Sequence, residues 1–456
     1  MLIDRRQFAG AALASAALGA LPARGALLQG QEEKSAPSAY RNEVEGFGPL
    51  VPDPYGYLDL PAGFSYQVVS QAGEPMDDGF VTPDHFDGMA CFAAGPGKVA
   101  LVRNHELKAD AHLLGPAGTS ERLRKRLLKS PHFGTDTYGR VLPGGTSTLM
   151  VDLATRRRTG QWLSLAGTAV NCAGGPTPWG SWLSCEESTI ARPEVDRSHG
   201  WIFEVPAAHR GLVEPVRLTG MGRFRHEAAA VDSSTGIVYL TEDKDDGLFY
   251  RFLPNSPGRI ARGGRLQALA LADQRGADTR NWHRRQLNVA QPLAVRWIDL
   301  TDTHSPDDDL RLRGRSAGAA IFARGEGIWF GQGELYFTCT SGGPSRHGQI
   351  MRVRPAAADT IELFVESSDA DVFDYGDNLT IAPWGDLIVC EDRTDGKTNH
   401  LRGVRPDGRI YTFARLHADT ELAGACFSPD GGTMFVNAYS PGRTLAITGD
   451  WSRGGA

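Results

Sequence analysis

A short recurring unit constrains the fold of this chain more than any other feature: a glycine, an apolar segment of strand length, and then polar or acidic residues. The copies span residues 97–106, 180–187, 236–243, 333–340, 385–392 and 432–439. Later copies without an insertion between them start about 50 residues apart, a period typical of β-propellers. We therefore predict an all-β fold, a six-bladed β-propeller with these segments as its innermost strands. A β-sandwich is the alternative, but it does not require a recurring unit.

Two insertions interrupt the repeat. Residues 120–130 start with a serine suited to capping a helix and carry leucines at helical spacing, so they predict a short helix with a basic, solvated face. Binding of that basic face to a membrane surface is the alternative interpretation. Residues 259–285 are rich in Ala, Arg and Gln and predict a partly helical lid or an excursion between blades.

The first 29 residues are typical of an export signal. Arg5 and Arg6 precede an uncharged, mostly apolar segment over residues 9–21, which is too short to span a bilayer. Adjacent arginines of this kind are typical of signals that the twin-arginine export machinery reads, although two chance arginines in an ordinary signal are the alternative. We expect a signal over 1–29, an extension over 30–46 and one propeller domain over 47–456. The mature chain is then a periplasmic or secreted monomer without stable membrane insertion.

Charge and missing motifs exclude several functions. The formal net charge is −6 and the acidic and basic residues are scattered, which argues against nucleic acid as the main partner. The sequence has no GxSxG elbow, no Walker loop, no HExxH and no dinucleotide-binding fingerprint. These absences argue against hydrolysis by a serine nucleophile, nucleotide turnover in a P-loop and dinucleotide-dependent redox chemistry.

Acidic residues follow the apolar segment in several copies of the unit. They are Glu106, Glu186 and Glu187, Glu242 and Asp243, and Glu391 and Asp392. Corresponding strand ends of a propeller meet at one mouth of its central channel, so these carboxylates are expected to cluster. Clustered carboxylates repel one another unless a cation compensates, and Ca²⁺ prefers oxygen ligands. The alternative is that they lie on solvated turns.

The six cysteines differ in their sequence context. They are Cys91, Cys172, Cys185, Cys339, Cys390 and Cys426. An even number permits disulfides, but the density is too low for a disulfide scaffold. Most of those at the ends of apolar segments are expected to be buried as small hydrophobes. Cys172 lies instead in a glycine-rich loop before an acidic strand end, where a thiolate would indicate a second, softer or redox-active metal, iron or zinc.

Three further segments offer candidate ligands. Arg324 lies two residues before Glu326, and an arginine beside bound metals suits a phosphate oxygen. Asp377 and the following asparagine place two oxygen ligands at the start of a strand. The His226–Glu227 pair alone is a weak signal.

Together these segments resemble the PhoX-type alkaline phosphatases and their wider bacterial family. The resemblance covers about residues 47–449, and it is carried by residues 103–106, 171–187, 226–227, 322–327, 376–379 and 422–431. It implies a propeller that hydrolyses phosphate monoesters at a mixed cluster of Fe³⁺ and Ca²⁺. A calcium-dependent propeller lactonase or esterase and a non-enzymatic binding scaffold are the alternatives.

The resemblance also implies roles for individual residues. Cys172 is the expected thiolate ligand of iron, and Arg324 is the residue expected to hold a phosphate oxygen. The carboxylate ligands implied for iron or calcium are Glu187, Glu227, Glu326 and Asp377. Because they lie close to the same motifs, Glu186 and Glu391 are further candidate metal ligands and Asn104 is a candidate catalytic residue.

Overall fold

The computed structural model describes residues 40–393 and 398–455, and their regular secondary structure is almost entirely β-strand. The predicted signal over 1–29 and most of the predicted extension lie outside the described residues. No helix in the described part is long and apolar enough to cross a membrane.

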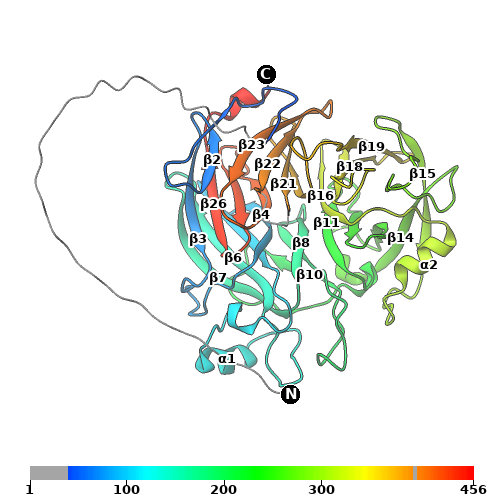
Figure 1. Ribbon diagram of the computed structural model, residues 1–456. Helices are drawn as coiled ribbons and strands as arrows, with labels where there is room; N and C mark the ends of the chain where they lie inside the picture. The colour runs from blue at the N-terminus through cyan, green and yellow to red at the C-terminus, as the bar shows by residue number, and fades with distance from the viewer. Residues whose placement is uncertain (1–39, 394–397, 456) are drawn as a thin grey trace, which may run out of the picture. The chain divides into compact units, whose positions relative to one another are not determined.

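Antiparallel meanders follow one another along the described chain (Figure 1). The first comprises β4 (Phe86–Ala93), β5 (Lys98–His105), β6 (Gly144–Asp152) and β7 (Arg157–Thr168). The second comprises β8 (Asn171–Pro176), β9 (Ser181–Glu186) and β10 (Ile202–Pro206). The third comprises β11 (His226–Val231), β12 (Val238–Glu242), β13 (Phe249–Pro254) and β14 (Gly264–Leu271), extended by β15 (Leu293–Leu300).

The later meanders include strands from the N-terminal part of the chain. The fourth comprises β16 (Gly325–Gly331), β17 (Glu334–Cys339), β18 (Gln349–Arg354) and β19 (Thr360–Glu366). The fifth comprises β20 (Gly376–Ile381), β21 (Leu387–Glu391), β22 (His400–Val404) and β23 (Ile410–Leu416), with β1 (Leu50–Val51) and β2 (Leu58–Pro61) at its outer edge. The sixth comprises β24 (Leu422–Phe427), β25 (Met434–Ala438) and β26 (Arg443–Thr448), and β3 (Ser65–Gln71) completes it.

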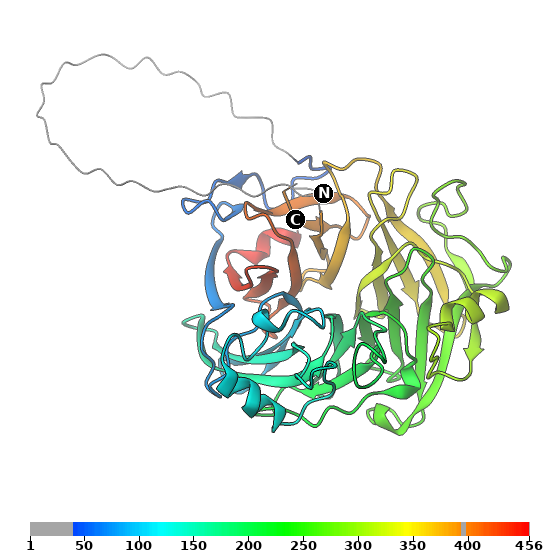
Figure 2. The same ribbon diagram turned by 60° about the horizontal axis from the view of Figure 1, so that its bottom comes forward.

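The arrangement is a propeller, which confirms the predicted all-β class. The first strands of the six meanders contact one another in sequence, and β24 contacts β4, so the ring closes. β3 pairs with β26 and thereby joins the beginning of the described chain to its end, blue beside red in Figures 1 and 2. The hydrogen-bonded sheets number five and not six, because β15 pairs with β19 and merges the third and fourth meanders into one nine-stranded sheet.

The recurring segments form the second strand of each meander, so their predicted place as innermost strands is wrong. The glycine that starts each copy lies at the turn between the first and second strands. The true innermost strands are harder to recognise because several are rich in glycine and alanine, such as β8 with the sequence NCAGGP.

Small residues are required where the innermost strands approach one another. A Cβ atom on Gly88 of β4 would lie 2.6 Å from the Cα atom of Ala173 in β8. A Cβ atom on Gly327 of β16 would lie 2.7 Å from the Cα atom of Asn378 in β20. Both contacts are with backbone atoms, which cannot move aside without shifting a whole strand. Backbone contact between neighbouring sheets therefore sets the width of the channel.

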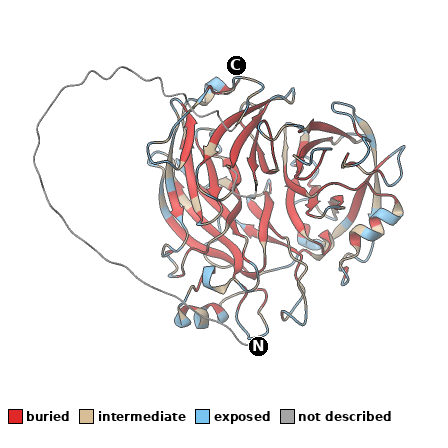
Figure 3. Ribbon diagram, viewed as in Figure 1, coloured by how far each residue is buried: buried red, intermediate tan, exposed pale blue. Residues whose placement is uncertain are grey.

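Helices are short and lie outside the ring. They are α1 (Glu121–Leu128), α2 (Leu310–Ala317) and the 3-10 turns η1 (His112–Leu114), η2 (Thr219–Met221), η3 (Ile260–Arg262) and η4 (Trp451–Gly455). Helix α1 confirms the helix predicted within 120–130. Both α-helices have an exposed face, whereas most strands are largely buried (Figure 3). Residues 259–285 contain only η3 as helix, and β14 occupies much of the segment, so the expectation of a partly helical lid there is wrong.

The close approach of the innermost strands generates a stability prediction. Gly88→Ala would force a methyl group against the backbone of β8, and overpacking of this kind costs about 1–3 kcal/mol. We expect a lower melting temperature in thermal unfolding followed by circular dichroism. The matched control is Gly432→Ala, because a Cβ atom there would meet no atom closer than 3.5 Å. Equal melting temperatures of the two variants would contradict this account of the channel.

Candidate functional site

A pocket of about 760 Å³ opens at the mouth of the channel where the innermost strands begin. The acidic and thiol side chains that line its inner part are Asp87, Glu106, Cys172, Glu187, Asp243, Glu326, Asp377, Asp392 and Glu421. Four cations line the pocket as well: Arg225 and Arg324, which pair with Glu187 and Glu326, and Lys108 and Arg140. Of the strand-end carboxylates predicted to converge, Glu106, Glu187, Asp243 and Asp392 line the pocket, whereas Glu186, Glu242 and Glu391 do not.

A β-bulge near the start of each innermost strand directs the ligand-type side chains. In β8, for example, the pairing shifts between Asn171 and Gly174, so three steps along β8 match two along β9. The same shift occurs in β4, β11, β16, β20 and β24. A bulge bends the strand and turns a side chain away from its regular direction. In five of the strands the residue just after the first pair is Asp87, Cys172, Glu227, Glu326 or Asp377.

Side chains of the preceding meander bind the backbone of these bulges. The hydroxyl group of Thr241 donates to the carbonyl oxygen of Glu326 at 2.6 Å, and that of Thr338 donates to the carbonyl oxygen of Asp377 at 2.6 Å. The amide of Asn104 donates to the carbonyl oxygens of Cys172 and Ala173, at 3.1 and 2.6 Å. Each bond crosses from one meander to the next, so sheet packing holds the ligand-bearing backbone in place.

The donor atoms fall into three groups that could each hold a cation. The groups are Glu106, Cys172 and Glu187; Glu227, Glu326 and Asp377; and Asp377, Asp392 and Glu421. Within each group the ligand atoms lie within 4.8 Å of one another. Because Asp377 belongs to two groups, the second and third are continuous and form a cluster, not isolated sites.

Burial and mutual repulsion oppose ionisation of this cluster. Burial, together with the charge of Asp392, raises the pKa of Asp377 to about 7. Burial raises the pKa of Glu106 to about 7, and burial with neighbouring carboxylates raises the pKa of Glu326 well above its usual value. Negative groups in such surroundings ionise together only when cations are bound among them.

Two buried carboxylate oxygens also indicate that cations are bound in the cluster. Oδ1 of Asp87 and Oε2 of Glu227 have no hydrogen-bond partner among the described residues. A buried polar atom without a partner is costly, and a bound metal ion would satisfy it. The Sγ atom of Cys172 lies 3.0 Å from Oε1 of Glu227, so a thiol joins the oxygen donors. The residues present therefore fit bound metal ions.

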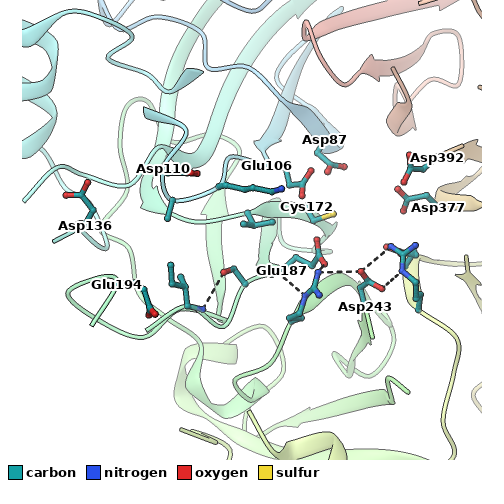
Figure 4. A pocket seen from close by; sticks show the side chains of 18 of the residues that line it. Asp87, Glu106, Asp110, Asp136, Cys172, Glu187, Glu194, Asp243, Asp377 and Asp392 are labelled. Atoms are coloured by element: carbon teal, nitrogen blue, oxygen red, sulfur yellow. Dashed lines mark hydrogen bonds and ion pairs between the residues drawn. The ribbon is translucent and has the colours of Figure 1, made fainter. Parts of the chain in front are cut away.

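One carboxylate, that of Asp243, contacts both Arg225 and Arg324. Nε of Arg324 donates to Oδ1 of Asp243 at 2.8 Å, and Oδ2 of Asp243 lies 3.6 Å from Arg225 (Figure 4). Arg225 also pairs with Glu187, and Arg324 pairs with Glu326 at 2.8 Å. The φ angle of Arg324 is 53°, a left-handed conformation that is uncommon outside glycine. Both side chains remain about one-third exposed, so they are accessible from the pocket.

Most of the predicted site residues lie in or directly behind this pocket. Cys172, Glu187, Arg324, Glu326 and Asp377 line it, and the buried Glu227 contacts Cys172 behind it.

Three predicted residues have other surroundings. Glu186 accepts hydrogen bonds from His199 and from backbone N–H groups, and Glu391 accepts from Arg402 and His400. Asn104 is fully buried and bonds to backbone, as described above. Neighbouring residues in a strand point to opposite faces, which is why Glu187 faces the pocket and Glu186 does not. These three therefore support the site from outside it.

Sequence reasoning missed Asp87 and Glu421, and it predicted Glu106 and Asp392 only as members of the carboxylate cluster, without individual ligand roles. Asp87 was missed because its strand, β4, precedes the first recurring segment. A usable signal does exist: Phe86-Asp87-Gly88 corresponds to Gly325-Glu326-Gly327 at the start of β16. Alignment of the innermost strands, and not of the second strands, would have found it.

The surroundings of Glu391 predict that its side chain stabilises the fold and does not bind a metal ion. Glu391→Gln would leave the guanidinium of Arg402 buried without its carboxylate, a change that costs about 3–5 kcal/mol. We expect a lower melting temperature with unchanged metal content, measured by elemental analysis. Glu121→Gln, in an exposed ion pair of α1, is the control and should change neither. Metal loss at an unchanged melting temperature would instead make Glu391 a ligand.

Comparisons with known proteins identify the family of this chain. The solved structure of Pseudomonas fluorescens PhoX in complex with vanadate, a transition state analogue, is similar at a TM-score of 0.63 and 18% identity, covering 90% of this chain and 98% of that one. The structure of XC5397 from Xanthomonas campestris, a gluconolactonase, matches at a TM-score of 0.41 and 12% identity, covering 90% of this chain and 99% of that one. The curated protein sequences gave no match. The family model described as alkaline phosphatase PhoX matches residues 45–442, nearly the whole described part, and the chain belongs to that family.

Proposed function

We propose that the pocket is the active site of a metal-dependent alkaline phosphatase, a hydrolase of phosphoric monoesters. The observation that carries the proposal is the buried cluster of carboxylates and one thiol beside two arginines at the channel mouth. Family membership supports the same activity. The pocket joins sites for cations to fixed positive charges, and a phosphate ester requires both.

The chain's own residues would bind and orient the phosphate. A guanidinium presents N–H groups in a planar fork that matches two phosphate oxygens. Asp243 holds the fork of Arg324 through Nε, which fixes its direction before substrate arrives. Arg225, held by Glu187 and Asp243, would provide a second cation from the neighbouring side. Fixed charges of this kind stabilise the charge that develops on the transferring group.

Calcium and iron are the metals that the donor set supports best. The second and third groups of the cluster offer only carboxylate oxygens, which are the ligands that Ca²⁺ prefers. The group of Glu106, Cys172 and Glu187 adds a sulfur donor, which favours a softer metal such as iron. When bound, these ions would supply Lewis-acid stabilisation of the phosphoryl oxygens. Asp87, with its unpartnered oxygen, would be a further ligand.

The lactonase alternative is less well supported. A calcium-dependent lactonase on a propeller would use carboxylates at the channel mouth, but it needs neither a thiolate nor two arginines held beside them. The same pocket contents argue against a binding scaffold without catalytic activity.

We also propose that the enzyme acts outside the cytoplasm, in the periplasm or as a secreted monomer. The support is the arginine pair and the apolar segment within residues 1–29, which are typical of the twin-arginine pathway. That pathway exports folded proteins, which suits a chain whose ligands come from strands spread over the whole sequence.

Replacement of Cys172 tests the softer metal site. Cys172→Ala should lose iron, measured by elemental analysis, together with most activity toward p-nitrophenyl phosphate, because the sulfur donor is removed. Calcium held by the oxygen-only groups should largely remain. Cys185→Ala is the matched control, since this thiol is also buried but lies in an apolar core. It should lower stability by about 1–2 kcal/mol and keep its iron. Full iron content in Cys172→Ala would remove the ligand assignment.

Replacement of Arg324 separates phosphate binding from metal binding. Arg324→Ala should keep its metals and lose about 10²–10³-fold in kcat/KM for p-nitrophenyl phosphate, because a charge-assisted contact to the transferring group is removed. Arg324→Lys should recover only part of the loss, since an ammonium lacks the planar fork. The control is Arg265→Ala, because Arg265 is exposed and its ion pair is long. Its kcat/KM should be unchanged. Near-normal turnover of Arg324→Ala would show that its ion pairs are only structural.

A further inference from the structure

The phosphatase pocket is larger than a phosphate group requires, and its two sides differ. Figure 4 places Asp377 and Asp392 at one side and Asp136 and Glu194 at the other. Val170 and Ile190 add apolar side chains to the lining of the pocket. A substrate whose phosphate lies at the cluster would extend its alcohol part along this wall, toward the side of Asp136 and Glu194.

A second, smaller cavity adjoins this wall. It measures about 240 Å³ and lies between α1 and the segment 138–143. Its apolar lining is formed by Pro116, Ala117, Leu127, Leu128, Val141 and Pro143. We name it the α1 groove. Tyr138 and Arg140 line both the pocket and the α1 groove, so the two spaces meet at these side chains.

The boundary between the two spaces is a rigid turn. Asp136 accepts hydrogen bonds from the backbone N–H groups of Tyr138 and Arg140, both at 2.9 Å. It also accepts from Nε of Arg140 at 2.7 Å and pairs with His112 at 3.0 Å. Tyr138 is 83% exposed although its backbone is fixed, so its ring is a surface available to a ligand.

The α1 groove also has an exposed apolar edge. Leu128 is 49% exposed, and Leu113 and Leu114 of the neighbouring η1 are 66% and 41% exposed. Arg124 and Lys125 line the same groove. Apolar surface left exposed beside a binding pocket commonly marks where an apolar ligand group docks.

We infer that the α1 groove takes the apolar tail of an amphiphilic phosphate monoester, such as a long-chain alkyl phosphate, whose phosphate lies at the metal-binding cluster. The inference rests on the proposed function and names its substrate class. The observation that carries it is that the two spaces are neighbours, since Tyr138 and Arg140 line both of them. The apolar lining of the α1 groove favours an uncharged alkyl chain as the alcohol part.

The test compares ethyl, octyl and dodecyl phosphate with the metal-loaded enzyme, each below its critical micelle concentration. Burial of a methylene group is worth about fourfold in affinity, so kcat/KM should rise at least about tenfold from ethyl to dodecyl phosphate. Dodecylphosphonate should also bind more tightly than ethylphosphonate by calorimetry. A flat dependence on chain length would overturn the inference, as would a rise confined to concentrations above the critical micelle concentration, because a lipid surface would then be the ligand.

A matched pair of variants locates the effect. Leu128→Glu should reduce the ratio of kcat/KM for dodecyl over ethyl phosphate toward one, because a charge would enter the α1 groove. Leu312→Glu on α2 is the control, since this leucine is also 49% exposed but lines none of the described cavities. An unchanged ratio in Leu128→Glu would overturn the assignment of the groove. Absence of turnover with every ester in the wild-type enzyme would refute the proposed phosphatase function instead.

Discussion

The close approach of six strands around one axis is the constraint on which the rest of this structure depends. The innermost strands contact each other backbone to backbone, so they carry small residues such as Gly88 and Gly327 along the channel. They also share a bulge near their first residue, where the strand begins at the channel mouth. Since a bulge redirects a side chain, the same irregularity presents an acid or a thiol to the mouth in one strand after another.

Electrostatics then determines what such a mouth can do. Buried carboxylates brought together by the ring have raised pKa values, and two of their oxygens lack partners among the described residues. The protein compensates in part through Arg225 and Arg324, which Asp243 links. The negative charge that these arginines leave uncompensated is the physical basis of a metal centre. Arg225 and Arg324, held by these carboxylates and still accessible, are the physical basis of phosphate recognition.

The scaffold around the mouth serves this arrangement in two ways. Side chains of the preceding meander, among them Asn104 and Thr338, hold the backbone of the bulges and thereby fix the ligand positions without touching a ligand. Acids that face away from the mouth, such as Glu391, instead form buried ion pairs within their own sheet. The insertion between β5 and β6, which includes α1, adds apolar surface beside the pocket. The core propeller therefore supplies the chemistry, and an insertion shapes the space for the alcohol.

The sequence by itself determined the all-β class, the recurring unit and the identity of most of the acids and of the thiol in the inner part of the pocket, because strand periodicity and acid placement are local properties. Cys172, Arg324, Glu326 and Asp377 could be named in this way. Only the tertiary structure decided which strand of each meander is innermost, and that Glu187 faces the pocket whereas Glu186 faces His199. Side-chain direction depends on strand register and on bulges, which arise from pairing with distant segments. The joining of two meanders through β15 and the meeting of the pocket with the α1 groove likewise depend on contacts between segments far apart in the chain, which local sequence patterns do not record.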